Sequence, residues 1–170
     1  MSPQRVFNVL FLCTGNSARS ILAEAILNKI GNGRFHAFSA GSWPKGQVHP
    51  GALRLLQARG YPTEALRPKS WDEFARPGAP EIDLIITVCD NAAGEVCPVW
   101  PGRPVSAHWG LPDPAAVEGD EAAVDGAFDE THRYLRSRLL LLASLNAGAL
   151  ENAALKARLT AIHESADANP

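Results

Sequence analysis

One segment near the N-terminus constrains the fold more than any other. An apolar, strand-like run over residues 6–12 ends at Cys13, and a helix-like pattern opens at Arg19 and Ser20. A loop that turns from a buried strand into a helix points successive backbone N–H groups into one concavity, where the helix N-terminus adds positive potential. A tetrahedral oxyanion fits such a cradle, and an arginine at its edge grips two oxygens at once. The predicted oxyanion-binding residues are Thr14, Gly15, Asn16, Ser17, Ala18, Arg19 and Ser20.

Cys13 lies at the base of this loop, where the same donors would stabilise a thiolate. Such settings lower a cysteine pKa from about 8.5 to roughly 3.5–7.5, so we expect a lowered pKa and a nucleophile. Gly15 and Asn16 suit a tight turn because both tolerate positive φ. Ser17 is expected to cap the helix, and Ser20 to hydrogen-bond the sulfur. The loop is not a nucleotide-binding P-loop, because the G-x-x-x-x-G-K-[ST] pattern is absent.

Strand-like and helix-like segments alternate along the rest of the chain, which is typical of an α/β fold with a parallel sheet. Expected strands cover 6–12, 35–40, 82–88 and 105–108. Expected helices cover 21–30, 49–59, a short turn from Ser70, and 121–144. A last helix-like segment covers 150–162 and runs into a polar tail.

Three chemically capable residues converge on one edge of this predicted sheet. Cys13 and Cys89 each follow a parallel strand, and ligand sites in open α/β sheets form at that edge. Asp113 follows the last strand and would return to the same place. We assign Cys13 as the nucleophile, Arg19 as the residue that stabilises developing charge, and Asp113 as the general acid that protonates the departing oxygen. For His108, at the same edge, a structural hydrogen bond is favoured over a catalytic role.

Composition narrows the functional classes. With 170 residues, 46% hydrophobic and 20% charged, the chain reads as one globular domain. The net charge is -2, and residues 104–132 carry seven acidic residues without a Lys or Arg, which argues against nucleic-acid binding. No apolar run is long enough to span a membrane, and no signal peptide is seen. Three cysteines without an export signal indicate the cytoplasm, and no spacing suggests a zinc site. We expect a monomer.

Several motifs together resemble a known family. The loop CTGNSARS is similar to the C-x5-R-S loop of the low-molecular-weight tyrosine phosphatase superfamily, and more narrowly to the thioredoxin-linked arsenate reductases built on that fold. The further motifs are Ser39-Ala40-Gly41, His49-Pro50, Thr87-Val88-Cys89, His108-Trp109-Gly110 and Asp113-Pro114. The resemblance implies a three-layer sandwich in which helices flank a four-stranded parallel sheet. We accordingly expect a phosphatase-like arsenate reductase domain over 1–146 and a C-terminal helical extension with a polar tail over 147–170.

The same resemblance implies a relay of three cysteines. Cys89 would attack the Cys13–arsenic adduct and release arsenite, and Cys97 would then resolve the Cys13–Cys89 disulfide by thiol–disulfide exchange. Thioredoxin would reduce the resulting Cys89–Cys97 disulfide. The loop between these two cysteines is one residue longer than the thioredoxin-linked pattern, so glutathione with glutaredoxin stays open as the reductant. No tightly bound cofactor is implied.

Two alternatives to arsenate reduction stay open. A low-molecular-weight protein tyrosine phosphatase would use only Cys13, Arg19 and Asp113. Such phosphatases usually carry aromatic residues after the Asp-Pro step, where this chain has Ala115 and Ala116, so arsenate is favoured and a residual phosphatase activity is expected. The second alternative is a non-enzymatic oxyanion-binding or redox-sensing module.

A cation site is the last feature that the resemblance implies. Some thioredoxin-linked relatives bind potassium near the loop, and Asn16, Glu24 and Ser39 align with three of the ligands. The acidic fourth position falls near Ser70 and Trp71.

Overall fold

The computed structural model describes residues 5–89, 104–151 and 153–167. Cys97 therefore lies outside the described residues. The strands are β1 (Phe7–Leu12), β2 (Phe35–Ala40), β3 (Leu84–Thr87) and β4 (Val105–His108). The helices are α1 (Arg19–Ile30), α2 (Pro50–Ala58), α4 (Glu121–Ala143), α5 (Ala147–Leu150) and α6 (Leu155–Asp167), with short 3-10 helices η1 (Trp71–Phe74) and η2 (Pro114–Ala116).

The four strands form one parallel sheet in the order β2-β1-β3-β4, which confirms the predicted α/β fold. Strand β3 is shorter than the expected 82–88. The carboxylate of Asp83 accepts the Asn8 N–H at 2.8 Å, so a side chain takes the place of a strand carbonyl at this end of the ladder. Helix α2 begins after His49, whose ring nitrogen accepts the Gly51 N–H at 2.9 Å and caps the helix.

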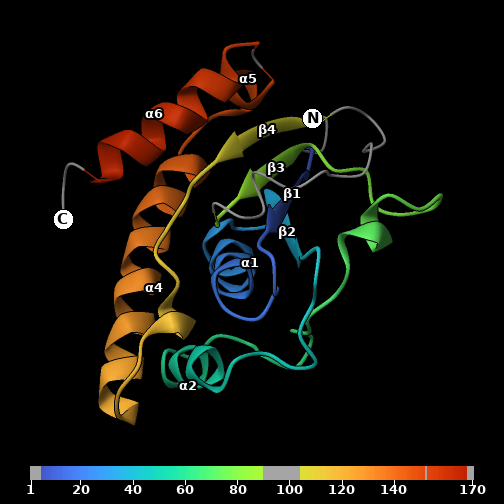
Figure 1. Cartoon of the computed structure of the whole chain (residues 1–170). Coiled ribbons are helices and arrows are strands. Elements are labelled where there is room, and N and C mark those ends of the chain that lie inside the picture. The colour runs from blue at the N-terminus through green and yellow to red at the C-terminus, as the bar shows by residue number, and fades with distance from the viewer. Residues whose placement is uncertain (1–4, 90–103, 152, 168–170) are drawn as a thin grey trace.

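Alternate residues of β1 enter two separate apolar clusters on the two faces of the sheet. Val9 and Phe11 pack in the larger cluster, which also contains the buried faces of α1, α2, α4 and α6. Leu10 and Leu12 point to the opposite face and pack with Trp71 and Phe74 of η1. The sheet therefore lies between a helical layer and a thinner layer that contains η1. Figure 1 shows α1 almost end-on, with α4 beside it and α2 below. In the part of the chain that the structure describes, no helix combines the length and apolar character needed to cross a membrane.

The C-terminal segment forms two helices, α5 and α6, where one helix-like segment over 150–162 was expected. Helix α6 is part of the main core, because Leu155 and Leu159 are 1% and 0% exposed. The indole N–H of Trp109, which directly follows β4, donates to the Leu159 carbonyl at 2.8 Å. This bond joins the last helix to the edge of the sheet where the candidate site lies.

A side-chain contact also joins α6 to α4. Arg138 is completely buried, and its Nε donates to His163 Nδ1 at 2.8 Å. Burial, followed by the charge of Arg138, lowers the pKa of His163 to about 4. A neutral His163 can therefore accept the guanidinium hydrogen bond at neutral pH.

We predict that Leu159→Ala lowers the free energy of unfolding by about 2–5 kcal/mol, because the substitution leaves a cavity in the main core. Urea denaturation followed by circular dichroism measures this loss. Lys156→Ala on an exposed position of the same helix is the matched control and should change stability by less than about 0.5 kcal/mol. Equal effects of the two substitutions would show that α6 does not belong to the core.

Candidate active site

The loop between β1 and α1 is held by backbone hydrogen bonds from the segment that follows β2. Three loop carbonyls accept these bonds, each at 2.9 Å: Trp43 donates to Thr14, Lys45 to Gly15 and His49 to Ser17. In a planar trans peptide the C=O and the following N–H point in opposite directions. The amides of Gly15, Asn16 and Ala18 are therefore directed away from that segment, toward the inner side of the loop. Such converging amides form an anion-binding concavity.

Asn16 shapes the turn of the loop, as its residue type predicted. Its φ is +46°, and its side chain is fully buried. The side-chain oxygen accepts the Lys69 N–H at 2.9 Å, and the side-chain NH2 donates to Ser20 Oγ at 2.8 Å. The hydroxyl of Ser20 thus accepts a hydrogen bond from Asn16, and among the described residues it makes none to the Cys13 sulfur. The expected helix cap by Ser17 is wrong, because Ala18 takes the N-cap position and α1 has no side-chain cap.

Gly41, directly after β2, allows the loop to approach the sheet closely. A Cβ atom at this position would lie 2.5 Å from the carbonyl oxygen of Cys13 and closer still to that of Thr14. The N–H of Gly41 donates to Lys69 at 2.9 Å and its carbonyl accepts from Trp71 at 3.0 Å. The backbone therefore continues from β2 along the base of the loop, where no side chain fits. Gly41 was noted in the sequence only as part of a family motif.

The structure brings Cys13 and Cys89 together at the carboxyl edge of β1 and β3. Cys13 and Cys89 are 6% and 2% exposed, and the two thiols lie close enough for Cys89 to act on the pKa of Cys13. The Thr14 N–H donates to Cys89 Sγ at 3.3 Å, so an amide of the predicted anion loop also contacts the second thiol. The two cysteines converge as expected. The contact of Thr14 with Cys89 was not predicted, because it depends on where the backbone places Cys89 after the end of β3.

The pKa of Cys13 is raised, and not lowered as the sequence suggested. The largest cause is the hydrogen bond to Cys89, followed by burial and by the charge of Cys89, whereas Arg19 and the Asn16 N–H act in the opposite direction. Two thiols in contact lose their protons in two coupled steps. A thiolate on one sulfur is stabilised by the proton on the other, and the second ionisation is disfavoured. The prediction failed because it considered only the donors of the loop and not a neighbouring thiol.

Arg19 reaches across the site from the first turn of α1. Its Nη1 donates to the Leu111 carbonyl at 2.7 Å, and its Nη2 lies 3.7 Å from Asp113 Oδ2. Nε of Arg19 is buried and has no hydrogen-bond partner within the described chain. A buried donor beside converging amides suits a bound oxyanion, because an oxygen of the ligand would satisfy it. The anchoring carbonyl of Leu111 was not identified from the sequence.

Asp113 lies at the outer edge of the site. Its Oδ1 accepts the Ala115 N–H at 2.9 Å and caps η2, while Oδ2 faces Arg19. The side chain is 41% exposed, so the carboxyl group is open to solvent. His108 is held through Nδ1 by the Thr87 hydroxyl at 2.6 Å, in keeping with the structural hydrogen bond expected for it.

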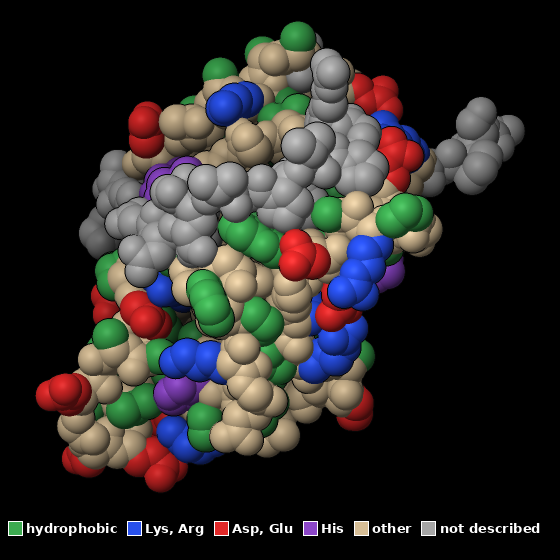
Figure 2. Space-filling view, turned by 45° about the vertical axis from the view of Figure 1, so that its right-hand side comes forward, with side chains coloured by type: hydrophobic (Ala, Val, Ile, Leu, Met, Phe, Trp, Pro, Cys, Tyr) green, Lys and Arg blue, Asp and Glu red, His purple; other side chains and the backbone are tan. Residues whose placement is uncertain are grey.

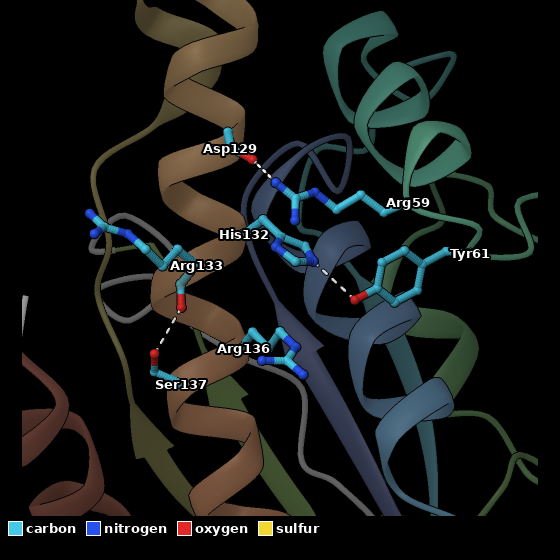
Figure 3. A pocket seen from close by; sticks show the side chains of 7 residues that line it. All are labelled: Arg59, Tyr61, Asp129, His132, Arg133, Arg136 and Ser137. Carbon is cyan, nitrogen blue, oxygen red and sulfur yellow. Dashed lines mark hydrogen bonds and ion pairs between the residues drawn. The ribbon is translucent and has the colours of Figure 1, made fainter.

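A cavity of about 550 Å³ lies elsewhere, between α4 and the end of α2 (Figure 3). It is lined by Arg59, Tyr61, Asp129, His132, Arg133, Arg136 and Ser137. Arg59 pairs with Asp129, and the Tyr61 hydroxyl is 2.9 Å from His132 Nε2. This cavity contains none of the predicted catalytic residues. Figure 2 shows Lys and Arg side chains gathered at the right of the face in view, with Asp and Glu side chains beside them.

The fold and the cysteine–arginine loop define the class of protein. Residues 8–154 match the family described as low molecular weight phosphotyrosine protein phosphatase, and the chain belongs to this family. It is 34% identical to an arsenate reductase from Halalkalibacterium halodurans over 113 residues, which cover 66% of this chain and 78% of that one.

Solved structures of arsenate reductases are also similar to this chain. The protein from Archaeoglobus fulgidus has a TM-score of 0.63 at 29% identity, covering 81% of this chain and 99% of that one. A thioredoxin-dependent arsenate reductase from Corynebacterium glutamicum has a TM-score of 0.55 at 27% identity, covering 83% of this chain and 65% of that one. Helix α6 begins just beyond residue 154, where the family match ends.

We predict that Gly41→Ala lowers the free energy of unfolding by about 1–3 kcal/mol, because the added methyl group overlaps the loop backbone. The same substitution should weaken the binding of inorganic phosphate, which calorimetry measures. Gly46→Ala is the matched control, because a Cβ there meets nothing within 4 Å. Unchanged phosphate binding in Gly41→Ala would contradict the role assigned to this close approach.

We predict that Cys89→Ser lowers the pKa of Cys13. The substitution removes the second ionisable thiol, while Arg19 and the Asn16 N–H continue to favour the thiolate. The rate of alkylation of Cys13 by iodoacetamide, followed by mass spectrometry as a function of pH, should therefore rise at lower pH than in the unmodified protein. A profile that does not move would exclude Cys89 as the cause of the raised pKa.

Proposed function

We propose that this protein is an arsenate reductase that converts arsenate to arsenite with electrons from its own cysteines. The observation that carries this proposal is the contact between Cys13 and Cys89 inside an oxyanion-binding loop. A hydrolase needs one nucleophile in such a loop, whereas a thiol-dependent reductase needs a second thiol within reach of the first. Two arsenate reductases that are 34% and 37% identical to this chain support the same conclusion.

The first chemical step forms a bond between sulfur and arsenic. Arsenate binds to the inward amides of Gly15, Asn16 and Ala18 and to Nε of Arg19, which has no partner among the described residues. The Cys13 thiolate attacks As(V) and one oxygen leaves as water after receiving a proton from Asp113. Arg19 and the loop amides stabilise the charge that builds on the remaining oxygens.

The second step transfers two electrons. The Cys89 thiolate attacks the sulfur of Cys13, the S–As bond breaks, and its electron pair stays on arsenic, which leaves as arsenite, As(III). The protein is left with one new disulfide between Cys13 and Cys89, and its other covalent bonds are unchanged. Cys97 then attacks the Cys89 sulfur and regenerates the Cys13 thiolate. The position of Cys97 lies outside the described residues, so its role rests on the sequence resemblance.

An external dithiol completes the cycle by reducing the Cys89–Cys97 disulfide. Thioredoxin is the proposed reductant, supported by the thioredoxin-dependent enzyme among the similar structures. Glutathione with glutaredoxin is the alternative, because of the longer loop between the two cysteines. Such a cycle requires reduced thiols, so we place the protein in the cytoplasm. We further propose that it is a monomer. Residues 1–146 would form the enzyme domain, and residues 147–170 its C-terminal extension.

Aryl phosphate hydrolysis is the second candidate activity. The same Cys13, Arg19 and Asp113 would serve a tyrosine phosphatase, and the family name describes that reaction. Trp43, in the segment that anchors the loop, is 78% exposed. An exposed indole there is suited to stack on an aromatic ring. We propose this as a side activity, weaker than arsenate reduction.

We predict that Cys89→Ser and Cys97→Ser each abolish steady-state arsenite production with thioredoxin, thioredoxin reductase and NADPH. Hydrolysis of p-nitrophenyl phosphate, which needs neither residue, should survive in both variants and shows that the loop is intact. The same assay is repeated with glutathione and glutaredoxin. Turnover in that assay alone would keep arsenate reduction and discard the role of Cys97. Phosphate hydrolysis without arsenite formation under either condition would make the phosphatase the main activity.

A further inference from the structure

Lys69, in the segment between α2 and η1, places a positive charge in the interior beside the site. Its side chain is 9% exposed, and Nζ donates to the Ser39 carbonyl at 2.8 Å. The ammonium lies 3.8 Å from Glu24 Oε1 on α1, whose side chain is 13% exposed. The hydroxyl of Ser39 also donates to this carboxylate. One partly buried cation thus faces one partly buried anion.

The main chain of Lys69 contacts the oxyanion loop directly. Its N–H donates to Asn16 Oδ1 at 2.9 Å, and its carbonyl accepts the Gly41 N–H at 2.9 Å. Asn16 in turn contacts Ser20 at the start of α1. The residue that supplies the buried charge therefore also holds the turn of the loop and the glycine beneath it.

The residues that the resemblance suggested as potassium ligands do come together, but they do not fit that ion. Asn16 Oδ1 is bound by the Lys69 N–H, the Ser39 carbonyl is bound by Nζ, and Glu24 is paired with the ammonium. At the expected acidic fourth position, the Ser70 hydroxyl accepts the Asp72 N–H and caps η1. A potassium ion would have to displace or lie beside an existing positive charge, where like charges repel.

We propose that Lys69 is a built-in cation: a positioning residue whose ammonium neutralises Glu24 and so holds the Asn16 turn of the oxyanion loop without potassium. This inference rests on the oxyanion site of the proposed function and adds how that site is supported. Burial lowers the pKa of Lys69, and the charge of Glu24 opposes this shift. Burial raises the pKa of Glu24, and the charge of Lys69 is the largest of the effects that oppose this rise.

The first test uses the unmodified protein. Inorganic phosphate is titrated by calorimetry in potassium, sodium and choline chloride at one ionic strength, and thermal unfolding is recorded in the same three salts. The proposal predicts the same dissociation constant within about twofold and the same midpoint in each. Tighter phosphate binding or a higher midpoint specific to potassium would overturn it.

The second test removes the ammonium. Lys69→Ala should weaken phosphate binding in choline chloride by about 5-fold or more, a coupling in the usual range between linked sites. Potassium should restore much of this loss, because the smaller side chain leaves room for an ion beside Glu24. Lys69→Met fills the space with an uncharged stem and should not respond to potassium. Lys156→Ala is the control and should behave as the unmodified protein. Unchanged phosphate binding in Lys69→Ala would overturn the proposal.

A double variant covers the case in which the single variants are too unstable to titrate. Lys69→Met leaves a buried carboxylate without its partner, whereas Glu24→Gln with Lys69→Met removes both charges. The double variant should therefore melt at a higher temperature than Lys69→Met alone. If it melts at the same or a lower temperature, the pairing is wrong. This comparison holds even if the protein binds no phosphate, a result that would instead refute the oxyanion site.

Discussion

The hydrogen bonds that turn the loop carbonyls outward are the constraint on which the site depends. The segment after β2 donates to Thr14, Gly15 and Ser17, and this leaves the loop amides on the inner side. The arrangement needs a close approach of the two backbones, which Gly41 allows. Each carbonyl that is anchored from outside fixes the direction of the following N–H, because the peptide unit is planar. The side chain of Asn16 then holds the turn from within, between the Lys69 N–H and the Ser20 hydroxyl.

Charges in and around this loop are balanced within the protein. Arg19 is held by the Leu111 carbonyl and faces Asp113, Glu24 is paired with Lys69, and Cys89 accepts the Thr14 N–H beside Cys13. A buried charge without a partner is costly, so each of these contacts also limits how the loop can move. The raised pKa of Cys13 belongs to the same balance. The loss of a second proton from the thiol pair is disfavoured, and an incoming oxyanion competes for the same loop donors.

Much of the fold could be predicted from local patterns. The fourth strand was expected at 105–108 and is observed there, and the order of strands and helices follows the alternation of apolar segments. Cys13, Cys89 and Asp113 were placed at one edge because parallel strands end together. Interactions between distant residues were not predictable in this way. The ammonium of Lys69 beside Glu24 joins residues 45 positions apart, and the sequence offers no period that reveals it. The cap by Ser17 failed for a similar reason: the Ser17 carbonyl accepts the N–H of the distant His49, and the N-cap position of α1 falls on Ala18.

The segment after β4 shows how the C-terminal helix and the site are joined. The Trp109 N–H donates to the Thr87 carbonyl at 2.7 Å and the Leu111 N–H to the Val88 carbonyl at 3.2 Å, so pairing with β3 continues past the strand. The Leu111 carbonyl is thereby fixed where it accepts the Arg19 guanidinium. The indole of Trp109, fully buried, is held from the other side by α6. The direction of the arginine thus depends on packing that begins at the last helix of the chain, beyond the part that matches the family.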